Sequence, residues 1–235
     1  MPRAGGHVTV AIWLGSAAPA RTIRWLDGAL SAAAKFAQAE PRKPPPVAIA
    51  AGEPTWLDLA ADRASRAGLA SAGVITDLKL DYLGWAQIVA AAAKHLGATT
   101  ILVDEASRPE RFPEVAAIAE LLEFAQLTHV VSLAPDGTTI HASRAAGNAL
   151  QTIRVRGSAV IGLRIAGPAI DEYPTPTPSA SMKRLDLTAI GLDPIVVGHR
   201  SLPPRAGQHP RHTLERVGEH LAVHVVPRSA KTRSG

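Results

Sequence analysis

Residues 157–193 read GSAVIGLRIAGPAIDEYPTPTPSASMKRLDLTAIGLD, and the character of the chain changes three times within them. Residues 158–165 are apolar and rich in β-branched side chains, which predicts a buried strand. Residues 171–179 alternate proline with threonine, so their backbone is extended and has few hydrogen-bond donors. Residues 179–185 have the composition of a short basic helix. We expect a strand, a stiff loop and a docking helix; a surface connection pinned by its prolines is the alternative interpretation.

The N-terminal half of the chain alternates apolar runs with amphipathic stretches. Continuous apolar runs predict strands buried on both faces, and apolar residues at helical spacing predict helices between them. Thr55 is expected to cap the second helix and Leu59 to face its core side, while Gly97 is expected to end the third. Four strand–helix units in succession predict a parallel sheet with helices on both faces. The expected strands are residues 8–14, 47–51, 73–76 and 99–103, and the expected helices are residues 21–39, 55–67, 82–96 and 112–124.

After the last of these helices the pattern changes to short strands, at residues 128–133, 138–141 and 150–156. Asp136 and Gly137 lie between the first two strands, and Asp-Gly in such a place is a hairpin signal. An antiparallel hairpin is therefore expected at the edge of the sheet. The predicted fold class is α/β, with a mostly parallel, doubly wound, Rossmann-like sheet.

Composition limits the available chemistry. Hydrophobic residues make up 46% of the 235 residues, which suits one sizeable globular domain, or one domain plus appendages. The absence of cysteine excludes disulfides, iron–sulfur clusters and thiolate zinc sites. The sequence has no uninterrupted apolar run of about 18 residues and no signal-like N-terminal segment, so a cytoplasmic protein without a membrane span is expected.

The formal net charge of +5 comes from the C-terminal end of the chain. Residues 1–199 carry equal numbers of acidic and basic side chains, so no basic surface for nucleic acid is expected there. Residues 200–235 hold seven Lys and Arg but only two Glu. This tail is expected to be solvated and partly disordered, and binding to an acidic partner or to RNA is the alternative.

The histidines offer one further possibility. His209 and His212 are three residues apart, and His220 and His224 would share a helix face at a spacing that suits a metal ion. Only Glu219 adds a carboxylate nearby, so ordinary surface histidines are the favoured interpretation. The sequence contains no Gly-x-Ser-x-Gly elbow, which argues against a hydrolase.

Taken together, the chain resembles the beta subunit of electron transfer flavoproteins over residues 8–205. The resemblance is carried by the order of the elements and by short motifs: Asp171-Glu172, Met182-Lys183, Gly191-Leu192-Asp193, the turn at residues 47–52 and the helix start at residues 25–30. The family's fold is adenine-nucleotide-hydrolase-like. It implies an α/β domain over residues 1–199, with a recognition loop at residues 166–185, followed by a C-terminal arm at residues 200–235.

The resemblance implies an electron-carrier subunit without a catalytic site of its own. Such a beta subunit forms a heterodimer with an alpha subunit that holds FAD, and relays electrons from a dehydrogenase to an acceptor. The Ala- and Arg-rich composition fits a high-GC bacterium, where versions associated with the peptide-derived cofactor mycofactocin occur. Partner contacts are expected through a helix in an apolar groove rimmed by acids. The expected contact residues are Tyr173, Pro178, Met182, Lys183 and Arg184; a local cap packed on the parent domain is the alternative.

The family also binds AMP at the carboxyl ends of the strands. The phosphate-binding pattern is lost here, because residues 104–113 contain two prolines and no glycine, Glu110 and Glu114 repel an anion, and Trp13 replaces the family's lysine. A packed site without nucleotide is therefore favoured, and a stand-alone adenine-nucleotide-binding module or a degenerate partner without ligand remain as alternatives. If AMP is bound, the candidate residues are Ala50, Ala51, Gly52, Asp104, Arg108 and Arg111.

Overall fold

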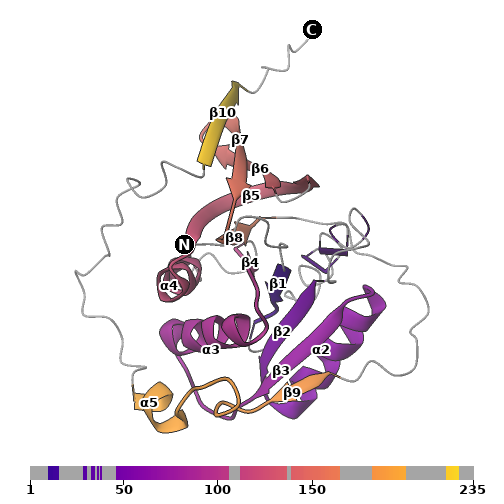
Figure 1. The fold of residues 1–235 in the computed structure, drawn as a ribbon, viewed down its shortest axis with the longest axis vertical. Helices are drawn as coiled ribbons and strands as arrows, with labels where there is room; N and C mark the ends of the chain where they lie inside the picture. Colours follow the sequence, from indigo (N-terminus) through magenta and orange to yellow (C-terminus); the bar gives the residue numbers. More distant parts are fainter. Residues whose placement is uncertain are drawn as a thin grey trace, which may run out of the picture.

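The computed structural model describes residues 10–15, 46–105, 112–136, 139–164, 182–199 and 221–227, with six helical positions between residues 29 and 38. Ten strands form one sheet: β1 (Val10–Trp13), β2 (Val47–Gly52), β3 (Ala70–Ile75), β4 (Thr100–Asp104), β5 (Ala125–Asp136), β6 (Thr139–Ala146), β7 (Ala149–Arg156), β8 (Ala159–Leu163), β9 (Lys183–Leu185) and β10 (Leu221–Pro227). Their order across the sheet is β10-β7-β6-β5-β8-β4-β1-β2-β3-β9. Figure 1 shows this sheet running the length of the molecule.

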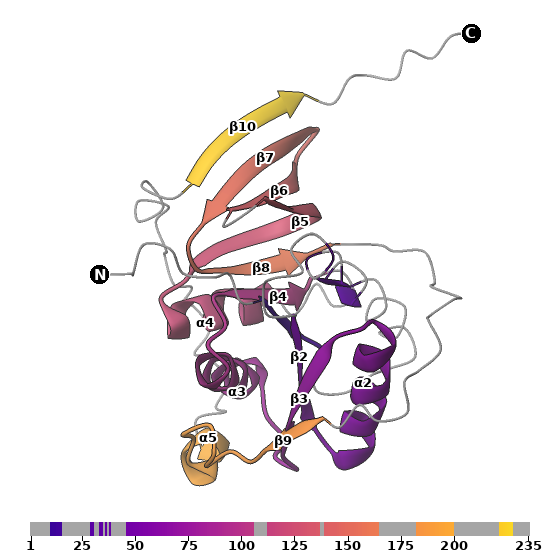
Figure 2. The ribbon, with the colours of Figure 1, turned by 45° about the vertical axis from the view of Figure 1, so that its right-hand side comes forward.

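The central strands are parallel, and helices cover both of their faces, so the predicted fold class is confirmed. The helices are α2 (Pro54–Arg66), α3 (Tyr82–His95), α4 (Phe112–Leu122) and α5 (Pro194–His199). Helix α2 lies on one face of the sheet, and α3 and α4 lie on the other (Figures 1 and 2). Because side chains alternate between the faces of a strand, each strand contributes to two cores. On β1, Ile12 belongs to the core under α2 and Trp13 to the core under α3 and α4.

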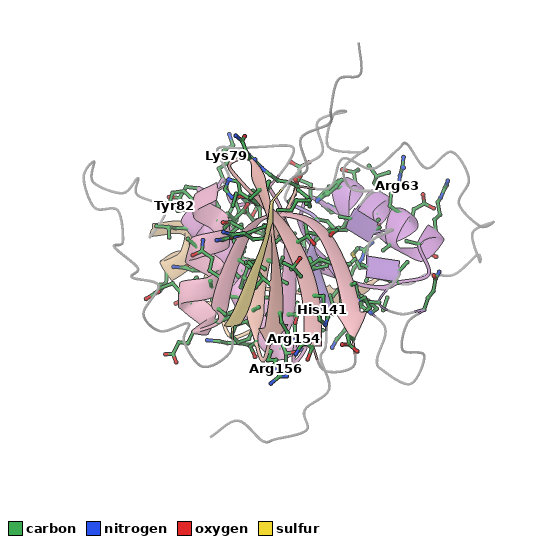
Figure 3. All side chains as sticks on the ribbon, turned by 90° about the horizontal axis from the view of Figure 1, so that it is seen from above. Arg63, Lys79, Tyr82, His141, Arg154 and Arg156 are labelled. Carbon is green, nitrogen blue, oxygen red and sulfur yellow. The ribbon has the colours of Figure 1, made fainter. Side chains whose placement is uncertain are left out.

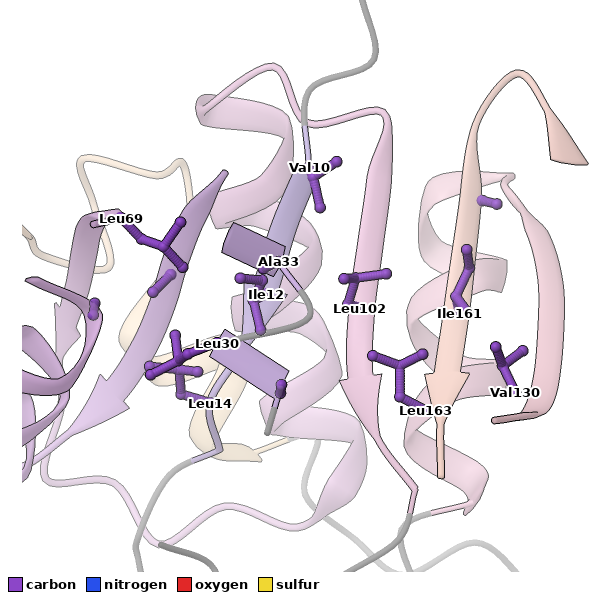
Figure 4. Close-up of a cluster of buried hydrophobic side chains, with 14 of the residues drawn as sticks. Val10, Ile12, Leu14, Leu30, Ala33, Leu69, Leu102, Val130, Ile161 and Leu163 are labelled. Atoms are coloured by element: carbon purple, nitrogen blue, oxygen red, sulfur yellow. The ribbon is translucent and has the colours of Figure 1, made fainter. Parts of the chain in front are cut away.

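Small side chains let the first core pack closely. Ala48 and Ala50 of β2 lie against Leu57, Ala60 and Ala64 of α2, and all five are buried. Figure 4 shows part of this cluster, with Leu14, Leu30, Leu102, Ile161 and Leu163 spread along one face of the sheet. The described positions between residues 29 and 38 are helical, in agreement with the helix expected there.

Two details of the helices differ from expectation, and one agrees. The N-cap of α2 is Glu53, followed by Pro54 in the first turn, so the prediction that Thr55 caps this helix is wrong. Leu59 is also exposed and does not face the core. Helix α3 ends as predicted, since the backbone at Gly97 turns through a left-handed conformation with a φ of 67°.

Strands β5, β6, β7 and β10 form an antiparallel extension that we call the wing (Figure 2). The hairpin predicted around Asp136 is confirmed, because Asp136 of β5 pairs with Thr139 of β6. A second tight turn at Gly147, with a φ of 56°, joins β6 to β7 and was not predicted. Ile140 and Ile153 on one face of the wing belong to the same core as the parallel strands. The wing is therefore part of the domain and not a separate module.

The segment expected to form a docking helix is a strand where the structure describes it. Lys183–Leu185 form β9, which pairs in parallel with β3 at the edge of the sheet. The prediction of a helix over residues 179–185 is wrong for these residues, and residues 165–181 lie outside the described part. Helix propensity in a segment this short is worth little, and pairing with an open strand edge outweighs it.

The motif at residues 190–193 forms the turn that follows β9. Gly191 has a φ of 80°, and Asp193 Oδ1 accepts a hydrogen bond from the Ile195 N–H at 2.9 Å as α5 begins. Just before it, Asp186 accepts hydrogen bonds from the Thr188 hydroxyl at 2.7 Å and the Ala189 N–H at 2.6 Å. These hydrogen bonds, the one from Thr188 first, hold the pKa of Asp186 below its ordinary value.

Residues 221–227 form β10, which the sequence reasoning missed. This strand pairs antiparallel with β7 over seven positions, from Leu221 opposite Val155 to Pro227 opposite Ala149. β10 therefore extends the sheet beyond residue 199. Among the described helices, no segment is long and apolar enough to cross a membrane.

Candidate functional site at the carboxyl edge of the sheet

In a parallel sheet the loops that follow the strands meet at one edge, which is where ligands bind in folds of this kind. Two contacts fix the loops after β1 and β2. The indole N–H of Trp56 in α2 donates to the Gly15 carbonyl at 3.1 Å, and the Thr76 N–H donates to the Gly52 carbonyl at 3.3 Å. Gly15 has a φ of 81°, so a glycine suits the sharp turn that follows β1.

The beginning of α2 is poorly suited to a phosphate group. Helix N-termini bind anions through free backbone N–H groups, and Pro54 in the first turn has none. The N-cap residue Glu53 adds an exposed carboxylate, and its side chain caps no N–H of the helix. The loop between β2 and α2 therefore presents negative charge where a nucleotide phosphate would bind.

Three further carboxyl groups lie at this edge and are buried: Asp104, Glu105 and Glu114. Glu114, in the first turn of α4, accepts a hydrogen bond from the indole N–H of Trp13 at 3.2 Å. Trp13 also packs on Trp85 of α3, with ring centroids 6.2 Å apart. The residue that replaces the family's lysine is thus a buried structural group. Trp13 joins β1 to α3 and α4, and its uncharged indole cannot pair with an anionic ligand as a lysine would.

Glu105 makes the most constrained contact of the site. Its Oε2 accepts the backbone N–H of His129 at 2.5 Å, and its Oε1 lies 3.2 Å from His129 Nδ1. His129 has a φ of 60°, an uncommon conformation for a residue other than glycine. It occupies the irregular part of β5, where pairing with β8 loses its register. The carboxylate therefore holds the bend at which β5 leaves the parallel sheet for the wing.

Gly162 of β8 makes room for that carboxylate. A Cβ at this position would lie 2.8 Å from Glu105 Oε2 and 3.4 Å from Val115 Cγ2. Strand β8 lies between β4, which Glu105 follows, and β5, which carries His129. The side chain of Glu105 therefore reaches across β8 by passing over a residue without a side chain.

The structure places the predicted AMP residues as follows. The side chain of Ala50 is in the core under α2 and that of Ala51 is in the core under α3, so neither faces the edge. Gly52 ends β2 at the edge, with its carbonyl bonded to Thr76. Asp104 is buried at the end of β4. Arg108 and Arg111, the two cations expected to offset the acidic groups, lie outside the described residues.

The predicted partner-binding residues divide into two groups. Tyr173 and Pro178 lie outside the described part of the chain. Met182 is half-buried and packs on the core under α2, which differs from the exposed position expected for it. Lys183 and Arg184 are exposed on β9, where Arg184 forms an ion pair with Asp58 of α2 at 2.9 Å.

A second charged surface lies on the wing. His141 of β6 is the register partner of Arg154 of β7, and Arg156 is two residues further along the same strand, so the three share one face. Figure 3 shows them together at one end of the wing, far from Lys79 and Tyr82 near the start of α3. Within the described ranges, no group of three or more His, Asp or Glu side chains is arranged to hold a metal ion.

The doubly wound sheet, with helices on both faces and loops gathered where its parallel strands end, defines a Rossmann-like α/β protein. Residues 25–183 match the family model described as the electron transfer flavoprotein domain, which is more than half of the chain. The chain therefore belongs to the electron transfer flavoprotein family, whose members are electron carriers. No individual curated protein matches the sequence.

Sequence reasoning noted the acidic character of this edge but missed the unit formed by Glu105, Gly162 and His129. An acidic residue directly after a buried strand, as in LVDE at the end of β4, was the available signal. His129 and Gly162 gave no such signal. Their roles depend on which strands become neighbours, and the sheet order places residues far apart in sequence beside one another.

Proposed function

We propose that this chain is the beta-type subunit of an electron transfer flavoprotein. It pairs with an alpha-type subunit that carries FAD, and the heterodimer relays electrons from a dehydrogenase to an acceptor. The family match supports the electron-carrier role. The proposal of a beta-type subunit rests on the motifs at residues 171–172, 182–183 and 191–193, and the mycofactocin-associated type is the member of the family that the composition favours.

One observation supports the proposal that the partner holds the FAD: the kinds of side chain found at the edge where the parallel strands end. FAD has a pyrophosphate, and proteins hold such groups with free backbone N–H groups or with cations. The described part of this edge presents Pro54, the exposed carboxylate of Glu53 and three buried carboxyl groups. A chain built in this way contributes surface to a flavin held elsewhere, and does not grip the pyrophosphate itself.

The same reasoning applies to AMP. The Ala50 and Ala51 side chains are committed to the two cores, and Glu105 is committed to His129. We therefore propose a heterodimer without a nucleotide at this edge. A stand-alone adenine-nucleotide-binding module, the alternative function, would need Arg108 and Arg111 to neutralise several carboxylates before a phosphate could approach.

Recognition of the dehydrogenase is assigned to residues 166–185. Of the residues expected to contact it, Lys183 and Arg184 have exposed side chains that suit an acidic rim, while Met182 helps to anchor the end of the segment on the core. Steering by such charges raises the rate of association and weakens with ionic strength.

The test is co-expression of this chain with an alpha-type subunit of the family, compared with expression of the chain alone. We expect a yellow heterodimer with one flavin per pair on size-exclusion chromatography, and a colourless isolated chain. Nucleotides released by denaturing the heterodimer are then separated chromatographically, and FAD without AMP is expected. A chain that retains a full complement of flavin by itself contradicts the proposal, as does tight binding of AMP or ATP to the isolated chain in calorimetry.

A further inference from the structure

Sulfur chemistry in this chain is confined to two residues. The sequence has no cysteine and two methionines, Met1 and Met182. Met182 lies directly before β9 and is the first described residue after Arg164. An oxidant that attacks sulfur therefore has a single target among the described residues.

Met182 occupies a slot made by a missing side chain. A Cβ at Gly73 of β3 would collide with Met182 Sδ, and it would also lie 3.2 Å from Leu57 Cδ2 of α2. The thioether thus rests directly on the backbone of β3, beside the apolar side chain of Leu57, and packs on the core under α2. A flexible, apolar methionine suits this contact with the β3 backbone and a leucine side chain.

The remaining contacts of β9 are few. The strand pairs with β3 at three positions, Ala72 with Lys183, Gly73 with Arg184 and Val74 with Leu185. The Arg184–Asp58 ion pair is exposed, and so is the contact of Lys183 Nζ with His95 Nε2 at 3.5 Å. Exposed ion pairs add little to stability, so half-buried Met182 and buried Leu185 hold the strand in place.

We propose that Met182 is a peroxide-sensitive modification site whose oxidation releases β9 from β3. Hydrogen peroxide transfers one oxygen atom to Sδ: the thioether is oxidised by two electrons to a sulfoxide, the peroxide O–O bond breaks and water is formed. The sulfoxide oxygen is polar and adds volume at an atom that rests where a Cβ of Gly73 would stand, beside the apolar side chain of Leu57. Residues 182–185 then leave the sheet edge. This inference does not depend on the proposed function.

Trypsin tests the proposal, because it cleaves after Lys183 and Arg184, and strand pairing protects both bonds. The purified full-length chain is treated with hydrogen peroxide under native conditions, in the presence of N-acetylmethionine as a reference thioether. Oxygen uptake at Met182 is followed by peptide mass spectrometry. Oxidation is expected to accelerate cleavage after Lys183 and Arg184 about tenfold or more, and methionine sulfoxide reductase is expected to restore protection.

Three comparisons separate local release from general damage. Cleavage after Arg63 and Arg66 in α2 reports on global unfolding and is expected to stay constant. Met182→Leu keeps an apolar side chain without sulfur, so peroxide should leave its cleavage unchanged. Met182→Gln places a polar oxygen in the slot, and untreated it should be cleaved like the oxidised wild type.

The proposal is overturned if Met182 takes up oxygen and the cleavage rate at residues 183 and 184 does not change. It is also overturned if Met182 stays reduced while N-acetylmethionine is fully oxidised, or if peroxide accelerates cleavage of Met182→Leu as much as cleavage of the wild type.

Discussion

Glu105 shows how a single buried carboxylate is held in this fold. It is nearly completely buried, at 2% exposure, and a charge in such a place is costly unless it is paired. Its partners are the backbone N–H and the imidazole of His129, a residue in a left-handed conformation. The hydrogen bond and the unusual backbone conformation support each other, because the bend of β5 turns the N–H toward the carboxylate.

Gly162→Ala is predicted to destabilise the protein by about 1–3 kcal/mol, the cost of overpacking a buried site. The new methyl group would collide with Glu105 Oε2 and would push the carboxylate away from the His129 N–H. Urea denaturation followed by circular dichroism measures the change in the free energy of unfolding.

The matched control for this prediction is a double-mutant cycle with Glu105→Ala, which removes the obstructing side chain. Gly162→Ala should cost clearly less in that background than in the wild type. Equal costs in the two backgrounds would show that the glycine is required for a reason other than the carboxylate.

Sequence reasoning at the level of single residues succeeded where the reason is local. Gly97 is a helix end whatever the tertiary structure. Such reasoning failed for Met182, whose basic neighbours suggested an exposed docking residue. Met182 packs against Gly73 and Leu57, which are more than 100 positions earlier in the chain. The sequence around Met182 cannot show that these two residues will lie beside it.

Helix α3 illustrates an element fixed by its own end signals. Asp81 at the N-cap accepts the backbone N–H of Gly84 through Oδ1 at 2.9 Å, and the helix ends at Leu96 and Gly97. Between these ends, Ala86, Ile88 and Val89 are buried in the core under α3 and α4. The cap fixes where the helix starts, and hence the position of Trp85 against Trp13.

Asp81→Ala is therefore predicted to lower the free energy of unfolding by about 1 kcal/mol, the usual cost of losing an N-cap. Asp77→Ala, at an exposed position of the same loop, is the control and should change stability by less than about 0.5 kcal/mol. Chemical denaturation of both variants in parallel provides the measurement. An Asp81 variant as stable as the Asp77 variant would show that the cap hydrogen bond contributes nothing in solution.

The elements that were predicted correctly are those with long, periodic or continuous apolar patterns. The bounds of β2, α3, β4 and β8 agree with the expected bounds to within about two residues. Strands that are buried on both faces are apolar throughout, and this makes them easy to recognise in the sequence. Strands β9 and β10 were missed because each is an edge strand, whose partner lies on one side only. Their pairing with β3 and β7 is decided by which edges of the sheet remain open, and not by their own composition.

In the molecule as a whole, the wing and the parallel sheet share a core. Strand β10 lies at the far end of the sheet, and among the described elements its extensive contacts are with β7.

Truncation after residue 219 is predicted to accelerate amide hydrogen exchange in β7 several-fold, because one edge of β7 loses its partner. Amides of β4, in the middle of the sheet, serve as the control and should exchange at the wild-type rate. Unchanged exchange in β7 would mean that β10 does not protect this edge in solution.

The sheet order has a consequence for the making of the protein on the ribosome. The two strands described after residue 164 become the two opposite borders of the sheet, β9 beside β3 and β10 beside β7. A nascent chain that has emerged up to β8 already holds the eight inner strands but exposes two unpaired borders. Translation proceeds at about 5–20 residues per second, so these borders stay open for several seconds before the later strands arrive. During that interval the growing polypeptide is vulnerable to cross-pairing with its neighbours on a polysome, and chaperone capture is most valuable then.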